Sequence, residues 1–379
     1  MNLVDARDGT MVWGEQFNRG IQDILSVQSA ISKEISSQLQ IKLNDQDAKQ
    51  VSKQYTAKPE AYDLYLKGQY FLMQRTQAST EKALDYFHQA IEKDSSYALA
   101  YAGMADAYNY LGITGALLGG PPPKQVMPKA REAAVKALQL DETVSLAHLV
   151  LGHIYTNYDW DWDRAEKEFN RAIELNPSDS AAYGLKALFY VSKGESEQAA
   201  SSIERFKELD PGYFPGRIMI VGIYYYWSRQ YDKAITELQS FNEMAPNYPN
   251  PYFWKGASYM EKKDYDRAND SFQKAVTLSH RAPVALSGLG ICYARAGKKQ
   301  EAENVLNELL EQSKTRYVPE FYLGCLYGSL GNKDEAFRLL DKAYQEHANG
   351  PSVMKAIALA DDLRSDPRFT ELLKKLNLI

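Results

Sequence analysis

The sequence predicts an all-α solenoid of about eight helix-turn-helix repeats, preceded by a small β-hairpin and one further helix. Three ladders of residues with a common period support this fold class. Each repeat has a small residue in its first helix, an aromatic residue three positions later, and an alanine in its second helix. The small residues are Gly68, Ala105, Gly152, Ala187, Gly222, Gly256, Gly290 and Gly324, and the last four intervals are 35, 34, 34 and 34 residues. The aromatic residues are Phe71, Tyr108, Tyr155, Tyr190, Tyr225, Tyr259, Tyr293 and Tyr327, and the alanines are Ala83, Ala130, Ala165, Ala199, Ala234, Ala268, Ala302 and Ala336.

The stretch from Ser145 to Pro177 gives the pattern of a single repeat. It consists of two amphipathic helices joined by a turn around Tyr158–Asp163, and Asn176-Pro177 ends the second helix because proline cannot continue it. Small residues let neighbouring helices approach closely, and the aromatic residue fills the gap to the next helix. A helix pair this short cannot bury its apolar stripe alone, so we expect copies to stack beside it.

These ladders resemble the tetratricopeptide repeat, whose period is about 34 residues. The resemblance covers residues 60–348. It implies a right-handed superhelix in which the first helix of each repeat lines the concave side. The pattern is specific for the fold and carries little information about chemistry.

Residues 1–44 do not fit the repeat. Leu3–Ala6 and Met11–Phe17 have the pattern of strands on either side of Arg7–Thr10, where Asp-Gly is a hairpin signal. Between Asp23 and Leu43 the apolar residues follow helical spacing, at Ile24, Val27, Ile31, Ile35 and Leu39. A lone hairpin is only marginally stable in water, so this piece looks incomplete.

Val4–Gly9, Val12–Glu15 and Asp23–Leu25 with Gln28 resemble the end of a TolB-like α/β domain. Such modules precede tetratricopeptide arrays in bacterial multidomain regulators, including serine/threonine kinases, class III adenylate cyclases and winged-helix regulators. The resemblance implies that the chain is the regulatory or sensory arm of such a protein. Either Met1 begins a fragment or the gene product itself is truncated.

The incomplete N-terminal piece has two possible arrangements. Missing partner strands would leave unpaired N–H and C=O groups beside Val4, Val12 and Trp13, and two copies could pair there as a homodimer. Alternatively, the apolar residues Ile24, Val27 and Ile31 fold the hairpin back onto the first repeat.

A polar connector over residues 45–59 leads into the repeats. The second repeat carries an insertion at residues 112–128, where Gly119, Gly120 and the prolines after them predict a loop. This loop is either a binding lid or a tolerated bulge. Residues 349–379 resemble the C-terminal closing segment of the same regulators, and a polar outer face there would cap the solenoid.

In the third repeat, the alternating aspartates and tryptophans from Asp159 to Asp163 suggest a calcium loop. An EF-hand loop requires glycine at its sixth position and glutamate at its twelfth, but Arg164 and Asn170 stand there, which excludes it. Asp163 with Glu166 instead predicts a helix N-cap with its capping-box partner. The Tyr158–Trp162 run also resembles a signature of the same regulators.

Composition narrows the function classes. The net charge of −5 gives no basic footprint for nucleic acid. The two cysteines, Cys292 and Cys325, fall in first helices of adjacent repeats and are expected to be small buried apolar residues. We see no secretory signal, and the longest apolar run, Ile218–Trp227, is too short for a membrane helix. The default location is cytoplasmic; it is extracytoplasmic if the chain is a fragment of a membrane-anchored protein.

No pattern predicts catalysis. His148 and His153 are five residues apart, on different faces of a helix, and no His-Glu-x-x-His motif, phosphate loop or nucleophile elbow occurs. We therefore expect no enzyme activity, no metal site and no cofactor.

The remaining functional surface is the concave groove. Carrying the repeat positions over predicts a partner-binding set there: Tyr65, Asp106, Asn109, Tyr110, His153, Asn157, Met219, Tyr226, Trp227, Phe253 and Met260. Aromatic residues and methionines in a concave wall suit an extended peptide or a helix. We expect a protein-interaction scaffold that binds a peptide or partner domain. The alternative is a small-ligand receptor or enzyme that uses the insertion at 112–128 as a lid.

Overall fold

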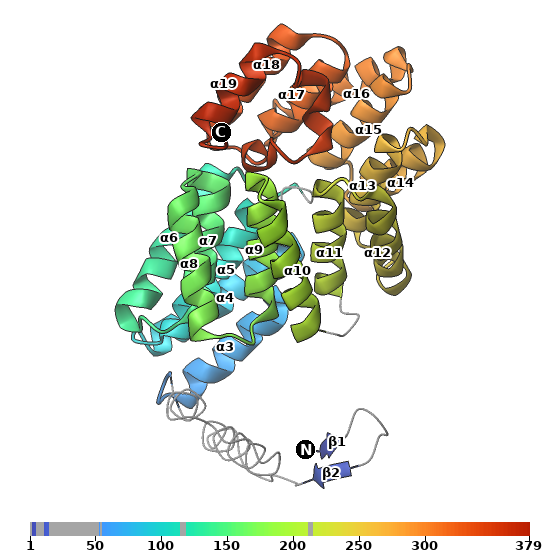
Figure 1. The fold of residues 1–379 in the computed structure, drawn as a ribbon. Coiled ribbons are helices and arrows are strands. Elements are labelled where there is room, and N and C mark those ends of the chain that lie inside the picture. Colours follow the sequence, from blue (N-terminus) through green and yellow to red (C-terminus); the bar gives the residue numbers. More distant parts are fainter. Residues whose placement is uncertain (1, 5–10, 15–52, 54, 114–118, 211–214) are drawn as a thin grey trace.

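The computed structural model describes residues 2–4, 11–14, 53, 55–113, 119–210 and 215–379 (Figure 1). Strands β1 (Asn2–Val4) and β2 (Met11–Gly14) pair antiparallel, with Leu3 opposite Trp13 and a shift in register at Val4. The turn predicted at Arg7–Thr10 and the helix predicted over Asp23–Leu43 lie outside the described residues.

Eight helix pairs follow one another from Pro59 to Gln345 within the described chain, and we number them repeats one to eight. The first helices are α3 (Pro59–Leu72), α5 (Ala98–Gly112), α7 (Ser145–Ile154), α9 (Ser180–Lys193), α11 (Pro215–Trp227), α13 (Pro249–Glu261), α15 (Pro283–Arg295) and α17 (Glu320–Ser329). The second helices are α4 (Gln77–Lys93), α6 (Pro123–Leu140), α8 (Trp162–Leu175), α10 (Ser196–Leu209), α12 (Tyr231–Met244), α14 (Tyr265–Leu278), α16 (Lys299–Gln312) and α18 (Lys333–Gln345). The predicted all-α solenoid of eight pairs is confirmed, and its right-handed sense stays a prediction.

The small-residue ladder marks close approach of the two helices in a pair. A Cβ atom placed on Gly68 would lie 2.5 Å from a ring carbon of Phe87, and one on Gly256 would lie 3.0 Å from Phe272. The alanines of the second helices are at most 1% exposed, and both cysteines are 1% exposed. The three ladders therefore form the core of the array, because only small side chains fit where helix axes come this close.

The insertion in repeat two is shorter than the sequence predicts. Helix α6 already begins at Pro123, and Pro128 lies inside it, so the predicted loop over 112–128 was wrong in its second half. Proline is well accommodated in the first turn of a helix because the N–H it lacks has no intrahelical partner there. Residues 114–118 of the insertion lie outside the described residues.

Repeat three has an unusual turn. After α7 the chain forms one π-helical turn, η3 (Tyr155–Asp159), and Trp160 follows with φ of 55°, in the left-handed region. The N-cap of α8 is Asp161, whose carboxylate accepts a hydrogen bond from the N–H of Arg164 at 3.1 Å. The predicted N-cap at Asp163 was therefore wrong by two residues, because the π turn lets α8 start earlier.

After repeat eight, the chain turns back along the array. It contains two 3-10 turns, η4 (Pro351–Val353) and η5 (Ala358–Leu363), and the last helix, α19 (Pro367–Lys375), which packs on α18. In Figure 1 the C-terminal end lies beside repeats three and four, and the indole N–H of Trp162 donates to the carbonyl of Leu376 at 2.7 Å. The first and last parts of the array are therefore in direct contact.

Candidate functional site on the concave face

Five of the predicted groove residues form one polar cluster with Arg75. The side chain of Asn109 lies 3.0 Å from Nδ1 of His153, and the backbone carbonyl of His153 accepts from the amide of Asn157 at 3.1 Å. The hydroxyl of Tyr110 donates to the carbonyl of Arg75. We call Arg75, Asp106, Asn109, Tyr110, His153 and Asn157 the polar cluster.

The positive charge in the polar cluster comes from Arg75. Its guanidinium lies 3.8 Å from the carboxylate of Asp106 and sits over the ring of Tyr110, 5.0 Å from the centroid. Burial, together with the smaller effect of the positive charge of Arg75, lowers the pKa of His153 to about 4. The imidazole is therefore neutral at pH 7, so Asn109 faces an uncharged partner.

The remaining predicted groove residues lie mostly in the apolar interior. Tyr226 and Phe253 are 0% exposed and Met260 is 2% exposed, while Met219 and Trp227 pack half-buried against the same core. Tyr226 contacts Trp254, with ring centroids 5.2 Å apart, and Tyr65 packs against Phe87 and Tyr97 at 5.9 and 5.4 Å. In this structure Tyr226, Phe253 and Met260 offer no surface to a partner.

The first helices of the later repeats are contacted by the chain's own C-terminal residues. Residues 350–364, which we call the C-terminal segment, run along the ends of these helices, and Gly350 lies directly against the ring of Phe321 in α17. The hydroxyl of Ser352 donates to the side chain of Asn157 at 2.9 Å. At the other end, a Cβ on Gly328 would lie 2.8 Å from Leu363. The C-terminal segment thus spans from repeat three to repeat eight.

Two arginines at the ends of first helices bind the acidic pair of the C-terminal segment, Asp361 and Asp362. Arg229, just after α11, binds Asp361 through two hydrogen bonds of 2.6 and 2.8 Å. Arg295, in α15, binds Asp362 at 2.8 Å and also donates to the backbone carbonyl of Ala358 at 3.0 Å. Bidentate arginine–carboxylate contacts are geometrically specific. We call Arg229 and Arg295 the arginine clamp.

The clamp belongs to a larger ionic network. Arg295 also binds Glu261 of α13 at 2.6 Å, and Ser329 donates to Asp362 at 2.5 Å. Burial alone would raise the pKa of Asp361, but hydrogen bonds from Arg229 and Arg364 outweigh it, so the pKa is lowered. Burial raises the pKa of Glu261 against the opposing charge of Arg295. Asp361 is therefore held as a carboxylate by its cationic partners.

Repeat three contacts the residues that come just before the C-terminal segment. His347 stacks on Trp160 with an interplanar angle of 2° and a centroid distance of 4.8 Å, and its Nδ1 lies 2.5 Å from the carbonyl of Tyr158. Trp160 also stacks on Tyr344 at 5.0 Å. Trp160, in the Asp159–Asp163 stretch that suggested a calcium loop, instead forms an aromatic contact with Tyr344 in α18 and with His347 just after it.

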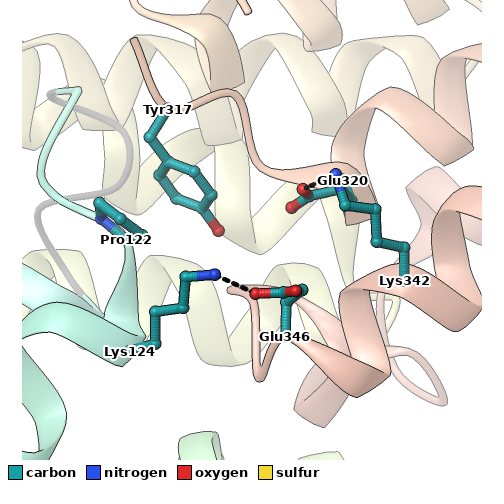
Figure 2. Close-up of a pocket in the computed structure, with 6 residues that line it drawn as sticks. All are labelled: Pro122, Lys124, Tyr317, Glu320, Lys342 and Glu346. Carbon is teal, nitrogen blue, oxygen red and sulfur yellow. Dashed lines mark hydrogen bonds and ion pairs between the residues drawn. The ribbon is translucent and has the colours of Figure 1, made fainter.

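A small pocket separates repeat two from repeat eight. It has a volume of about 140 Å³, and Pro122 and Lys124 at the start of α6 face Tyr317, Glu320, Lys342 and Glu346 across it (Figure 2). Lys124 pairs with Glu346, and Lys342 pairs with Glu320 at 3.0 Å. The four charged side chains of its lining neutralise one another through these two ion pairs.

Sequence reasoning missed most of the residues that bind the C-terminal segment. The partners of Arg295 in the C-terminal segment lie 63 to 67 residues further along the chain, beyond any repeat register. Asp361 and Asp362 were visible as an acidic pair, without a sign of their partners. Among the described residues, no cluster of three or more His, Cys, Asp or Glu side chains could hold a metal ion. No helix in the described part of the chain is long and apolar enough to cross a membrane.

Two family models, both described as tetratricopeptide repeat, match residues 161–214 and 259–318. A Rhizobium meliloti protein described as adenylate cyclase 3 is 28% identical over 103 residues, which cover 27% of this chain and 18% of that protein. Human Superkiller complex protein 3 is 25% identical over 234 residues, covering 62% of this chain and 14% of the relative. The chain therefore matches less than a fifth of the length of either relative.

Among solved structures, the human IFIT1 dimer with m7Gppp-AAAA covers 96% of this chain, and this chain covers 90% of that one. The TM-score is 0.54 and the sequence identity is 16%, so the likeness concerns the fold alone. With the residue ladders and the eight helix pairs, the matches establish that the chain carries tetratricopeptide repeats.

Proposed function

We propose that the chain is a non-catalytic protein-interaction scaffold that binds a peptide or partner domain on its concave face. Tetratricopeptide repeats are found in scaffold-like proteins, and the residues described here form no cluster of catalytic groups. One observation carries the proposal: the first helices already hold a peptide stretch of the chain, the C-terminal segment, and the guanidinium of Arg295 donates to its backbone carbonyls at Ala358 and Leu359. A surface with such donors is equipped to bind peptides.

The part of the concave face that remains open is the polar cluster. The side chain of Arg75 is 45% exposed, and that of Asp106 is 22% exposed. A partner that approaches repeats one to three would meet the guanidinium of Arg75 and the carboxylate of Asp106. These groups favour a polar peptide over an apolar one at this end.

Site-specific photo-cross-linking tests this function. A photoreactive residue is placed at Arg75 in the polar cluster and, as the matched control, at Glu132 on the exposed side of α6. Partner proteins from cells of the source organism should cross-link at position 75 and not at position 132. Cross-links confined to position 132 would place the partner surface on the second helices and contradict the proposal.

We also propose that this scaffold is the regulatory or sensory arm of a bacterial signalling protein. The resemblance of residues 1–44 to the end of a TolB-like domain and the match to the Rhizobium meliloti protein support this role. The coding sequence upstream of Met1 tests it. An in-frame kinase, cyclase or DNA-binding domain would identify the output, whereas an upstream stop codon would contradict the multidomain arrangement.

The ligand-receptor alternative has weaker support. The pocket between repeats two and eight has a volume of about 140 Å³, well below the roughly 300 Å³ at which small-molecule sites begin. Its lysines and glutamates already neutralise one another. A ligand there would have to break the Lys124–Glu346 pair, which is on the surface and only weakly stabilising.

As a second proposal, we suggest that two copies of the chain form a homodimer through the N-terminal hairpin. The two short strands β1 and β2 form a sheet of two strands in the described part of the chain, so each has one edge without a partner strand there. Light scattering compares the intact chain with one lacking residues 1–22. A dimer that is lost on truncation supports the proposal, and equal monomer masses would remove it.

A further inference from the structure

The C-terminal segment is bound in the manner of a peptide ligand. Its backbone forms only local turns, such as those from Val353 to Gly350 and from Ala356 to Val353, and it adds no strand or long helix to the array. The contacts that hold it are side-chain contacts: five apolar residues are at most 7% exposed, namely Val353, Met354, Ile357, Leu359 and Leu363. Among the described residues, its backbone makes no hydrogen bond to the backbone of the repeats, and its departure would expose these core side chains to water.

Recognition of the segment has two chemically distinct parts. The apolar residues pack into the hydrophobic core of the array, and the acidic pair Asp361-Asp362 then enters the arginine clamp at 2.6 to 2.8 Å. Arg295 is well buried, with 13% of its side chain exposed, so removing its carboxylate partners would leave a charge with little access to water. Glu261 of α13 remains a partner of Arg295 when the segment is away, and an acidic occupant adds a second carboxylate.

The fit of the native segment is incomplete. The hydroxyl of Tyr226 is buried without a hydrogen-bond partner among the described residues. Burial raises the pKa of Tyr226 well above its usual value, and the nearby charges of Glu261 and Asp361 add to this. A buried donor left unsatisfied is unfavourable. An occupant with an acceptor placed against this hydroxyl would bind better than the native one.

We propose that the arginine clamp and the concave face beside it are an exchangeable site for an acidic peptide, one that carries an apolar stretch followed by two consecutive carboxylates. The C-terminal segment is the chain's own occupant and competes with that peptide. This inference rests on the proposed function, because it names the chemistry of a partner for the same concave face. The site is closed until the partner displaces the segment.

Competition between the tethered C-terminal segment and an added peptide sets how tightly that peptide binds. The apparent affinity for a partner peptide equals the intrinsic affinity multiplied by the fraction of molecules in which the segment is away from the site. The segment is tethered, so its effective concentration at the site is in the millimolar range or above. Weakening the segment without touching the arginines should therefore raise the affinity for a peptide added in solution.

Hydrogen–deuterium exchange on the wild-type chain gives the first test. If the segment leaves the site on its own, amides within residues 350–364 exchange together and at least tenfold faster than those of α15 and α17. Equal exchange rates for the segment and these two helices would mean that it opens only when repeats seven and eight unfold, and the proposal would then be wrong.

Fluorescence anisotropy gives the second test, with a labelled synthetic peptide of residues 350–366 as the probe. The full-length variant Asp361→Asn/Asp362→Asn weakens the tethered segment and keeps both arginines. It should bind the probe at least tenfold more tightly than the wild type. A control probe with asparagine at these two positions should bind the variant at least tenfold more weakly than the acidic probe.

A folded variant that binds the probe no better than the wild type, or that binds both probes equally, would overturn the proposal. Circular dichroism checks that the variant is folded. If it is not, the experiment uses Ser329→Ala in its place, because this change removes one hydrogen bond to Asp362. Photo-cross-linking at position 75 depends on a different part of the concave face. Cross-links there without probe binding would refute the exchangeable site alone, and their absence would refute the proposed function.

Discussion

Tyr226 stabilises the fold through its complete burial, although the sequence predicts it in the partner-binding groove. It is 0% exposed and contacts Trp254. Truncating a buried aromatic residue costs about 3–5 kcal/mol. With an unfolding entropy of about 2.1 cal/mol/K per residue, Tyr226→Ala should lower the midpoint of thermal unfolding by about 4–6 °C.

The matched control is Tyr70→Ala. Tyr70 is 64% exposed on α3, so its removal should shift the midpoint by less than about 1 °C. Differential scanning calorimetry of both variants checks this. Equal midpoints for wild type and Tyr226→Ala would mean that the Tyr226 side chain is not in the core.

His153 gives the array a dependence on pH that its sequence alone does not predict. Its folded-state pKa is lowered to about 4, against about 6.5 in an unfolded chain. Between these values the unfolded chain binds more protons, so the stability contributed by neutral His153 is complete above pH 6.5 and is lost as the pH falls towards 4. His153→Asn should lack this loss.

Thermal midpoints of the wild type and His153→Asn, measured from pH 7.5 to pH 4, test this expectation. The difference between the two curves isolates His153, because lowered-pKa carboxylates such as Asp361 and Glu308 are present in both. The wild-type midpoint should fall more steeply below pH 6.5. Parallel curves would show that His153 titrates at its ordinary pH in the folded chain.

At the level of the elements, the repeats were predictable and the irregular turns were not. The ladder from Gly68 to Gly324 reports a steric constraint, close helix packing, which acts locally and recurs in every repeat. The π turn at Tyr155–Asp159 and the left-handed Trp160 follow from a long-range contact, because Trp160 stacks on Tyr344 and His347. No local pattern encodes such a contact.

The residues of the candidate site also fall into a group that the repeat register predicts and a group that it does not. Asp106, Asn109, Tyr110 and His153 come from neighbouring first helices, so the repeat register brought them together correctly. The register also predicted Phe253 and Met260 in the groove, but both side chains are buried in the core. The sequence could not predict that residues 350–364 contact the ends of the later first helices, because a single occupant segment has no repeat of its own.

Trp160 should hold the C-terminal part of the chain to repeat three. Trp160→Gly removes the stacking ring and supplies a residue suited to the left-handed backbone. The resulting opening should speed tryptic cleavage after Lys355 and Arg364 by at least about tenfold, which corresponds to a loss of 1.4 kcal/mol. Limited proteolysis followed by mass spectrometry measures the rates.

The control for this experiment is Tyr70→Ala, at the opposite end of the array and far from these contacts. Its cleavage rates at the two sites should equal those of the wild type. Unchanged cleavage in Trp160→Gly would mean that the aromatic contact does not hold the chain end.

At the scale of the whole molecule, the array is closed on itself. Repeat three contacts the residues after repeat eight through Trp160, Trp162 and Asn157. Lys355 adds a hydrogen bond of 2.8 Å to the carbonyl of Lys193 in repeat four. An open solenoid would leave the ends of its first helices to solvent or a partner, whereas here the C-terminal segment contacts several of them.

Cross-linking between repeat three and the C-terminal segment tests this closure most directly. In a chain with Asn157→Cys and Ser352→Cys, whose native side chains are 2.9 Å apart, a short bifunctional thiol reagent should join the two positions in most molecules. The buried Cys292 and Cys325 should not react. A control pair, Asn157→Cys with Leu310→Cys on the exposed side of α16, should stay unlinked. Mass spectrometry that finds residues 157 and 352 linked confirms the closed array, and equal, low linkage in both pairs would contradict it.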